Sequence, residues 1–413
     1  MNVPFFDLQR QYARLREEIE PAVLAVLESC SYIGGKAVED FERRVAEYIH
    51  VRHAIACGNG TDALMLALRA CGIRRGDEVI TTPFTFFATA EAIAAVGATP
   101  VFADICPEDC TIDPAQIEAK ITEKTRAILP VHLFGAPCDM EAILDIARRH
   151  GLRVVEDAAQ AIGCEYRGQR IGSTADISCF SFYPTKNLGG AGDGGMVTTN
   201  DDSLALILRS LREHGAGKRG ADARALLECS WARGQEGQEG SAEAETTEAV
   251  LQETGAGYDP YKYSNSLIGY NSRLDALQAA VLSVKLKHLD EFHRQREAIA
   301  KRYTEHLSAA VKKPAARPEG RHGWHQYVIR TAHKEALCAY LNEQGIGAGT
   351  FYPIPLHLQK AFDCLGYQKG DFPHAEQAAR ETVCLPMFPE LRKDEQDSVI
   401  SQVNAFVERE EPR

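Results

Sequence analysis

The chain has 413 residues, of which 45% are hydrophobic, and this length allows two domains that each bury a core. Its formal net charge of −12 argues against nucleic acid or an anionic membrane as a partner, because the chain has no surplus of cations to neutralise phosphates. No apolar run approaches the roughly 20 residues that span a bilayer, and the first residues do not resemble a signal peptide. The twelve cysteines show no CxxC pair or zinc-ligand spacing, so we expect a cytoplasmic protein with reduced thiols and no metal site.

Short apolar runs alternate with helical patterns between residues 54 and 200. The predicted strands cover 77–84, 99–105, 126–134 and 152–157, and the predicted helices cover 88–97 and 139–151. Asp113 and Pro114 suit the N-cap and first position of a further helix. Continuous apolar strands joined by helices indicate a parallel sheet that is covered on both faces. Ligands of such sheets bind beyond the carboxyl ends of the strands.

The stretch from Gly215 to about Pro260 interrupts this pattern. It is rich in Glu, Gln, Gly, Ala and Thr and has few side chains to bury. We therefore expect an acidic low-complexity insertion over residues 216–260. Its composition favours a mobile surface segment, and a lid above the active site is the alternative.

A long helix is predicted from Leu274 toward Tyr303, because apolar residues recur there at helical spacing. It would lead into a smaller C-terminal α+β domain, whose elements are predicted at 324–330, 334–347 and 393–408. The expected organisation is an N-terminal arm and large domain over residues 1–273, followed by the linking helix and the small domain over 274–413.

Residues 57–70, CGNGTDALMLALRA, place a glycine turn before a helical pattern. Unpaired N–H groups and the positive end of the helix dipole make such a turn suited to phosphate, although an ordinary capped helix gives the same pattern. The chain has no P-loop motif and no Rossmann fingerprint, so a nicotinamide dehydrogenase is disfavoured.

Two charged residues complete a possible site. Asp157 ends the predicted strand 152–157 and would stand at the edge of the sheet where ligands bind. The alternative is a strand-end carboxylate that only contacts solvent. Lys186 lies between the aromatic run CFSFYP and a loop with five glycines, NLGGAGDGG, which is an unusual place for a surface lysine. A lysine that is removed from water has a lowered pKa, and its neutral amine can form a Schiff base with a carbonyl cofactor.

The glycine turn, Asp157 and Lys186 together meet the needs of pyridoxal phosphate. This cofactor requires a phosphate cradle, an acid that keeps its ring nitrogen protonated and a lysine for its aldehyde. An aromatic residue that covers the ring could come from TPFTFFAT, where Phe84, Phe86 and Phe87 follow a predicted strand.

With these motifs, the chain resembles the DegT/DnrJ/EryC1/StrS sugar aminotransferases along nearly its whole length. The matching segments include YIGGKAVEDFERRVAEYI, EDAAQAIG, FSFYPTKNLGGAGDGGMVTTND, GYNSRLDALQAAVL and FYPIPLHLQKAF. The resemblance implies the pyridoxal-phosphate transferase fold of type I, with a mostly parallel seven-stranded sheet covered by helices. Only the insertion from about 217 to 258 departs from the usual length.

The resemblance also implies roles for individual residues. Lys186 would bind the cofactor covalently and shuttle protons, and Asp157 would pair with the pyridine nitrogen. Other cofactor contacts are expected from Gly60, Thr61, Phe86, Gln160 and Ser181, and from Asn271, which would reach the phosphate bound by the neighbouring subunit. Substrate contacts are expected from Tyr183, His325, Tyr352 and His357, although each of these could be purely structural.

The function implied by the resemblance is the transfer of an amino group to a nucleotide-linked keto sugar, with L-glutamate as donor, by a homodimer with shared active sites. Some family members that carry histidine in place of the lysine are dehydratases, so Lys186 favours transamination. The segment KNLGGAGDGG is more similar to members that aminate C3 than to those that act at C4. A dehydratase or a regulatory protein that binds the cofactor without turnover is the alternative.

Overall fold

The computed structural model describes residues 2–233 and 263–410. Within them, seven strands form a central sheet in the order β1-β9-β8-β5-β4-β2-β3. The strands are His53–Cys57 (β1), Glu78–Thr81 (β2), Thr99–Phe102 (β3), Thr125–Ile128 (β4), Arg153–Asp157 (β5), Ile177–Ser181 (β8) and Gly195–Thr199 (β9). β9 runs antiparallel to β1 and β8, and the other neighbours pair in parallel. The expected mostly parallel sheet is confirmed.

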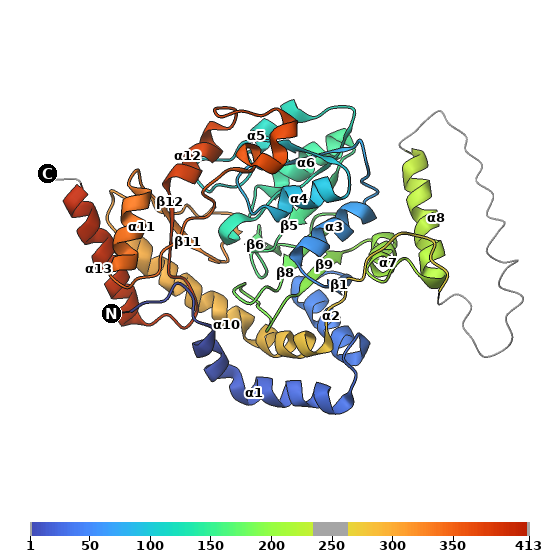
Figure 1. The fold of residues 1–413 in the computed structure, drawn as a ribbon, viewed down its shortest axis with the longest axis horizontal. Coiled ribbons are helices and arrows are strands. Elements are labelled where there is room, and N and C mark those ends of the chain that lie inside the picture. The colour runs from blue at the N-terminus through green and yellow to red at the C-terminus, as the bar shows by residue number, and fades with distance from the viewer. Residues whose placement is uncertain (1, 234–262, 411–413) are drawn as a thin grey trace, which may run out of the picture.

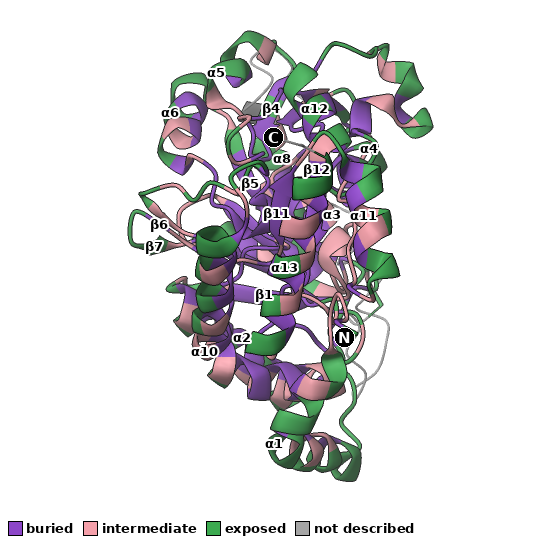
Figure 2. Ribbon diagram, turned by 90° about the vertical axis from the view of Figure 1, so that its left-hand side faces the viewer, coloured by how far each residue is buried: buried purple, intermediate pink, exposed green. Residues whose placement is uncertain are grey.

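Helices cover both faces of this sheet (Figure 1). The two helical layers can be followed from neighbouring residues of β1. Ile55 shares a buried cluster with residues of α3, α4 and α7, and Ala54 shares a second cluster with residues of α2, α6 and α10. These helices are Gly35–Ile49 (α2), Gly60–Ala70 (α3), Ala88–Ala95 (α4), Met140–His150 (α6), Asp202–Leu211 (α7) and Ala276–His306 (α10). The strands between them are largely buried (Figure 2). Apolar residues on successive positions of each strand therefore have a partner layer on either side.

A side-chain cap marks the start of the short helix that was predicted at Asp113 and Pro114. The Asp113 carboxylate accepts a hydrogen bond from the Ala115 N–H at 3.0 Å, and a short helix, Pro114–Ile117 (α5), follows and continues as the 3-10 turn Glu118–Lys120. The strand expected over 126–134 is shorter, since β4 ends at Ile128. Pro130 has no N–H for a sheet ladder, and the chain then turns through the 3-10 segment Leu133–Gly135.

Part of the expected insertion is helical. Helix α8, Gly217–Arg233, packs beside α7 and buries Ala223 and Leu227. It stands out from the body of the molecule (Figure 1). The segment from 234 to 262, which holds most of the low-complexity sequence, lies outside the described residues.

The C-terminal part has its own core but shares the long helix with the large sheet. α10 contributes Leu282 and Leu289 to the core of the large sheet, and Ile299 and Tyr303 to the C-terminal core. The C-terminal elements are Gly320–Arg321 (β10), Tyr327–Arg330 (β11), Lys334–Glu343 (α11), Leu356–Leu358 (η3), Lys360–Leu365 (η4), Pro373–Glu381 (α12), Thr382–Leu385 (β12) and Lys393–Glu410 (α13). β11 and β12 form an antiparallel pair, and β10 joins the short strands Glu165–Tyr166 (β6) and Gln169–Arg170 (β7). No described helix is long and apolar enough to cross a membrane.

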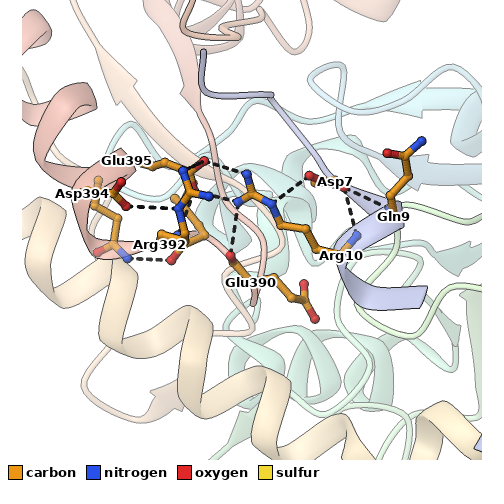
Figure 3. Close-up of polar contacts among 9 residues, drawn as sticks. Asp7, Gln9, Arg10, Glu390, Arg392, Asp394 and Glu395 are labelled. Atoms are coloured by element: carbon orange, nitrogen blue, oxygen red, sulfur yellow. Dashed lines mark hydrogen bonds and ion pairs between the residues drawn. The ribbon is translucent and has the colours of Figure 1, made fainter. Parts of the chain in front are cut away.

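The N-terminal arm is attached to this C-terminal part. Val3 forms a parallel bridge with Ile346, and Asp7 then caps the first helix, Leu8–Ser29 (α1). The guanidinium of Arg10 donates two hydrogen bonds of 2.7 Å to the buried carboxylate of Glu395 on α13 (Figure 3). A bidentate pair of this kind fixes orientation as well as position, so the arm is held in one place.

Candidate active site

A cavity of about 690 Å³ lies at the carboxyl ends of β5 and β8, where the predicted parallel sheet should bind its ligand. The N-terminus of α3 and residues of the C-terminal part complete its wall. The predicted site residues that line it are Gly60, Thr61, Phe86, Asp157, Gln160, Ser181, Tyr183, Lys186, His325 and Tyr352.

Close packing requires glycine in the loop that follows Lys186. A Cβ on Gly189 would lie 2.1 Å from the Pro184 carbonyl oxygen, a distance that no side chain could occupy. Helix α10 holds the same loop, because the Lys285 ammonium donates to the Gly189 carbonyl at 2.8 Å and the Gln278 side chain accepts from the Ala191 N–H at 2.7 Å. The loop therefore fixes the backbone from which Lys186 reaches the cavity.

The amine of Lys186 is suited to nucleophilic chemistry. Burial lowers the pKa of Lys186 to about 8, and the nearby carboxylate of Asp157 partly opposes this shift. With such a pKa, about a tenth of the amine is neutral at pH 7, whereas an ordinary lysine is almost wholly charged. Only the neutral amine can add to a carbonyl group.

Asp157 is held by two donors. Thr89 Oγ1 donates to one carboxylate oxygen at 2.8 Å, and the Ala159 N–H donates to the other at 3.1 Å. Burial raises the pKa of Asp157, and the hydrogen bond from Thr89 is the largest effect that opposes the rise. The sequence analysis did not identify Thr89, because nothing in its local sequence separates it from a buried helical threonine that only packs.

Gln160 has a defined orientation. The Phe134 N–H donates to its side-chain oxygen at 2.6 Å, so its amide NH₂ points the other way and donates to the Tyr352 hydroxyl at 3.1 Å. Gln160 thus presents a hydrogen-bond donor beside the cavity. A donor at this position suits an oxygen atom of a ligand.

The start of α3 offers an anion site. The Asn59 side chain caps the helix by accepting from the Asp62 N–H at 2.8 Å, and the N–H groups of Gly60 and Thr61 make no hydrogen bond to any described residue. A Cβ on Gly60 would lie 2.8 Å from the Ser181 Cβ, so glycine lets the hydroxyl of Ser181 sit beside these N–H groups. Two free amides, a hydroxyl and a helix N-terminus suit a phosphate.

These groups fit pyridoxal phosphate. The start of α3 provides a phosphate cradle, Lys186 an amine of lowered pKa and Asp157 a buried carboxylate, and Gln160 supplies a donor for a ring oxygen. All of them face one cavity, although they come from three separate stretches of the sequence.

Two predicted residues lie outside the cavity wall. Asn271 is exposed, and its backbone bridges to Glu213. His357 is buried against the ring of Phe372, and its Nε2 lies 3.2 Å from a carboxylate oxygen of Glu376. His357 therefore packs outside this cavity, and its Nδ1 makes no hydrogen bond to any described residue.

The N-terminal arm contributes two aromatic side chains that the sequence analysis missed. Phe5 and Phe6 line the cavity and pack against Phe351 and Phe388 of the C-terminal part. The partners are separated by more than 300 positions in the sequence, and no local pattern signals such a contact.

The sequence model of the DegT/DnrJ/EryC1/StrS aminotransferase family matches residues 13–229 and 239–404. The chain belongs to this family. Of the segment expected to be an insertion, only residues 230–238 fall outside the match. The match confirms the resemblance and the aminotransferase activity that it implied.

Two relatives are similar over almost their whole length. A protein of Geobacillus stearothermophilus named pleiotropic regulatory protein is 46% identical, over 98% of this chain and 99% of its own. UDP-N-acetyl-3-dehydro-alpha-D-glucosamine 3-aminotransferase of Acidithiobacillus ferrooxidans is 42% identical, over 95% of each chain.

Solved structures confirm the fold. DesV of S. venezuelae, in complex with a ketimine intermediate, superposes with a TM-score of 0.86 at 40% identity, over 98% of this chain and 99% of its own. NtdA of Bacillus subtilis, with bound cofactor PMP, has a TM-score of 0.82 at 30% identity, over 98% of this chain and 85% of its own. Family membership, these structures and the cavity together identify pyridoxal phosphate as the cofactor.

Proposed function

We propose that the chain transfers an amino group from L-glutamate to C3 of a nucleotide-linked keto sugar. The observation that carries this proposal is the cavity in which Lys186, with its lowered pKa, and Asp157 stand together. The Acidithiobacillus relative is named as a 3-aminotransferase, which supports amination at C3. The segment KNLGGAGDGG supports the same position. Glutamate as the donor rests on the resemblance to the family.

Bound pyridoxal phosphate supplies a carbonyl group and an electron-accepting ring. The chain's own part is to bind, orient and move protons. The Gly60 and Thr61 amides and the Ser181 hydroxyl would hold the phosphate, Gln160 would donate to a ring oxygen, and Asp157 would hold a proton on the ring nitrogen. Lys186 Nζ would take the substrate proton and return it, as general base and then general acid.

We further propose a homodimer that completes the cavity. Phe86 and Tyr183 line the cavity yet are 56% and 54% exposed in the single chain. Outside the cavity, Leu24 and Leu27 of α1 are also exposed, which is unusual for two leucines so close together. A second copy would cover these side chains, and its Asn271 would reach the phosphate site.

The regulatory alternative is suggested by the name of the Geobacillus relative. A protein that only binds the cofactor needs no residue that carries protons. This chain has Lys186 for that role, together with Asp157 and Gln160 to hold the ring. A dehydratase is disfavoured because Lys186 is retained. We also propose that the protein is cytoplasmic, as its reduced cysteines suggest.

The test is an absorption spectrum of the purified protein, before and after L-glutamate is added. We expect glutamate to convert the visible band of bound pyridoxal phosphate to that of pyridoxamine phosphate, and a 3-keto nucleotide sugar to restore the first band with formation of a 3-amino sugar. Lys186→Ala should abolish both changes. A band that no amino acid alters would contradict an aminotransferase, and amination of a 4-keto sugar alone would contradict C3.

A further inference from the structure

His325 lines the cavity and makes a buried contact with Asn187, the residue that follows Lys186 in the sequence. The Asn187 side chain is 4% exposed and His325 is 8% exposed, and His325 Nδ1 lies 3.2 Å from the Asn187 side-chain oxygen. In a neutral imidazole one nitrogen donates and the other accepts, so the contact is productive in only one of the two tautomers.

The orientation of Asn187 decides between these tautomers. Its amide nitrogen donates to the Gly323 carbonyl at 2.8 Å. A carbonyl oxygen can only accept, so the atom of Asn187 that faces Gly323 must be the NH₂ group, and the atom that faces His325 must be the oxygen. His325 Nδ1 must then carry the hydrogen, and Nε2 must be the bare acceptor.

The backbone around His325 is held just as firmly. The His325 N–H donates to the Phe134 carbonyl at 3.0 Å, and the Gly323 N–H donates to the Gly135 carbonyl at 2.8 Å. The buried guanidinium of Arg296 donates to the carbonyls of Trp324 and His325 at 3.0 and 3.3 Å. The backbone that carries the His325 ring is therefore fixed relative to Asn187.

The charges that act on His325 keep it neutral. Burial is the largest effect that lowers the pKa of His325 well below its ordinary value, and the cations Lys186 from the loop after β8 and Arg296 from α10 lower it further. Nε2 makes no hydrogen bond to any described residue, and His325 lines the cavity.

We propose that Asn187 is a positioning residue that fixes His325 as the Nδ1–H tautomer, so that Nε2 stands in the cavity as a permanent hydrogen-bond acceptor. Such an acceptor selects a ligand group that can donate, such as a sugar hydroxyl, and disfavours a carboxylate at the same position. The tautomer follows from the structure alone, whereas its use toward a sugar rests on the proposed function.

The direct test is ¹⁵N NMR of the wild-type holoenzyme labelled on its histidine rings, with His325→Gln to identify the signals of His325. We expect a donor-type signal for Nδ1 and an acceptor-type signal for Nε2, both unchanged between about pH 6 and 8. A donor-type Nε2, or an imidazolium at neutral pH, would overturn the proposal whether or not the protein aminates a sugar.

Two variants test the role of Asn187. Asn187→Leu should let both tautomers form and lower kcat/KM for the keto sugar about tenfold, the usual effect of one lost hydrogen bond. Asn187→Asp should raise the pKa of His325, because a carboxylate replaces the amide, and should add an ionisation to the pH profile that the wild type lacks.

Asn404→Leu is the matched control. Asn404 also bridges two backbone groups, since it donates to the His306 carbonyl and accepts from the Ser308 N–H, but neither of these hydrogen bonds involves His325. It should leave the His325 signals and kcat/KM unchanged. Equal losses of kcat/KM in the two leucine variants, with the His325 tautomer intact, would reduce Asn187 to a purely structural residue and overturn its positioning role.

Discussion

At the scale of single residues, Lys186 meets two demands that usually conflict. Its amine must be uncharged to attack a carbonyl, yet lysine is normally protonated at neutral pH. Burial favours the neutral form, while the carboxylate of Asp157 favours the charged form. The pKa of about 8 is the balance of these two effects, and it leaves the amine ready to gain or lose a proton near neutrality.

This balance predicts how the cofactor-free protein takes up pyridoxal phosphate. The rate of covalent attachment should rise with pH while the neutral fraction of Lys186 rises, and should level off above a pH of about 8. It can be followed by the growth of the visible band after the cofactor is added at a series of pH values. A rate that still increases about tenfold per pH unit up to pH 10 would mean that the pKa of Lys186 is not lowered.

Some site residues could be predicted from the sequence and others could not. Lys186 and Asp157 stand at sites marked by local sequence, a glycine-rich loop and a strand end. Thr89 and Asn187 have ordinary local sequences, and their importance comes from contacts with residues far away in the chain. His325 was predicted as a substrate contact, but its tautomer depends on the orientation of an amide that only the fold determines.

At the scale of elements, α10 supports the glycine loop that follows Lys186 as well as linking the two parts of the chain. Its Lys285 is 6% exposed and donates to the Gly189 carbonyl, whereas Lys287 on the same helix is exposed and pairs with Glu18. Burial lowers the pKa of Lys285 to about 8, so this contact is made at the cost of desolvating an ammonium group.

Lys285→Met should therefore loosen the loop, with Lys287→Met as its matched control on the same helix. Loss of a charged donor costs about 1.5–3 kcal/mol, so amide hydrogen exchange at Gly190 and Ala191 should become roughly ten to a hundred times faster. Lys287→Met should leave these amides unchanged. Equal exchange in both variants would show that the loop does not depend on Lys285.

The elements best predicted from the sequence are those defined by local chemistry. Asp113 caps α5, and Asp139 and Gly151 bound α6, where the sequence pattern placed that helix. The pattern placed the end of β4 too late, because apolar residues continue through Leu133, whereas beyond Ile128 the pairing with β5 is reduced to the isolated bridge between Val131 and Asp157. It also missed α8, whose few buried residues, such as Leu227, are too sparse to give a clear period.

At the scale of the whole molecule, an ion pair between Arg10 and the buried carboxylate of Glu395 helps to join the N-terminal arm to the C-terminal part. Arg10 lowers the pKa of Glu395 through its two hydrogen bonds, so the pair stabilises the fold above the ordinary glutamate pKa of about 4.3. The stabilisation is lost as the pH falls through the lower pKa of Glu395 in the folded state. No local sequence feature could have predicted this contact.

Arg10→Met should lower the free energy of unfolding by about 1–3 kcal/mol at pH 7, since Arg392 still pairs with Glu395. Urea unfolding should show that the difference from the wild type shrinks at a pH low enough to protonate Glu395. Arg16→Met is the control, because Arg16 makes only an exposed pair with Glu20 on the same helix. A loss that is independent of pH would mean that Arg10 acts through packing alone.

The anchoring of the arm also has a consequence for biosynthesis. Phe5 and Phe6 are synthesised well before the residues that hold the arm in place, Ile346 and Glu395, which lie more than 300 positions later in the chain. At ~5–20 residues per second, the roughly 200 residues from Lys186 to Glu395 take about 10–40 seconds to synthesise. During that interval the nascent chain carries Lys186 without the finished wall of the cavity, so we expect stable cofactor capture only after Glu395 has been synthesised.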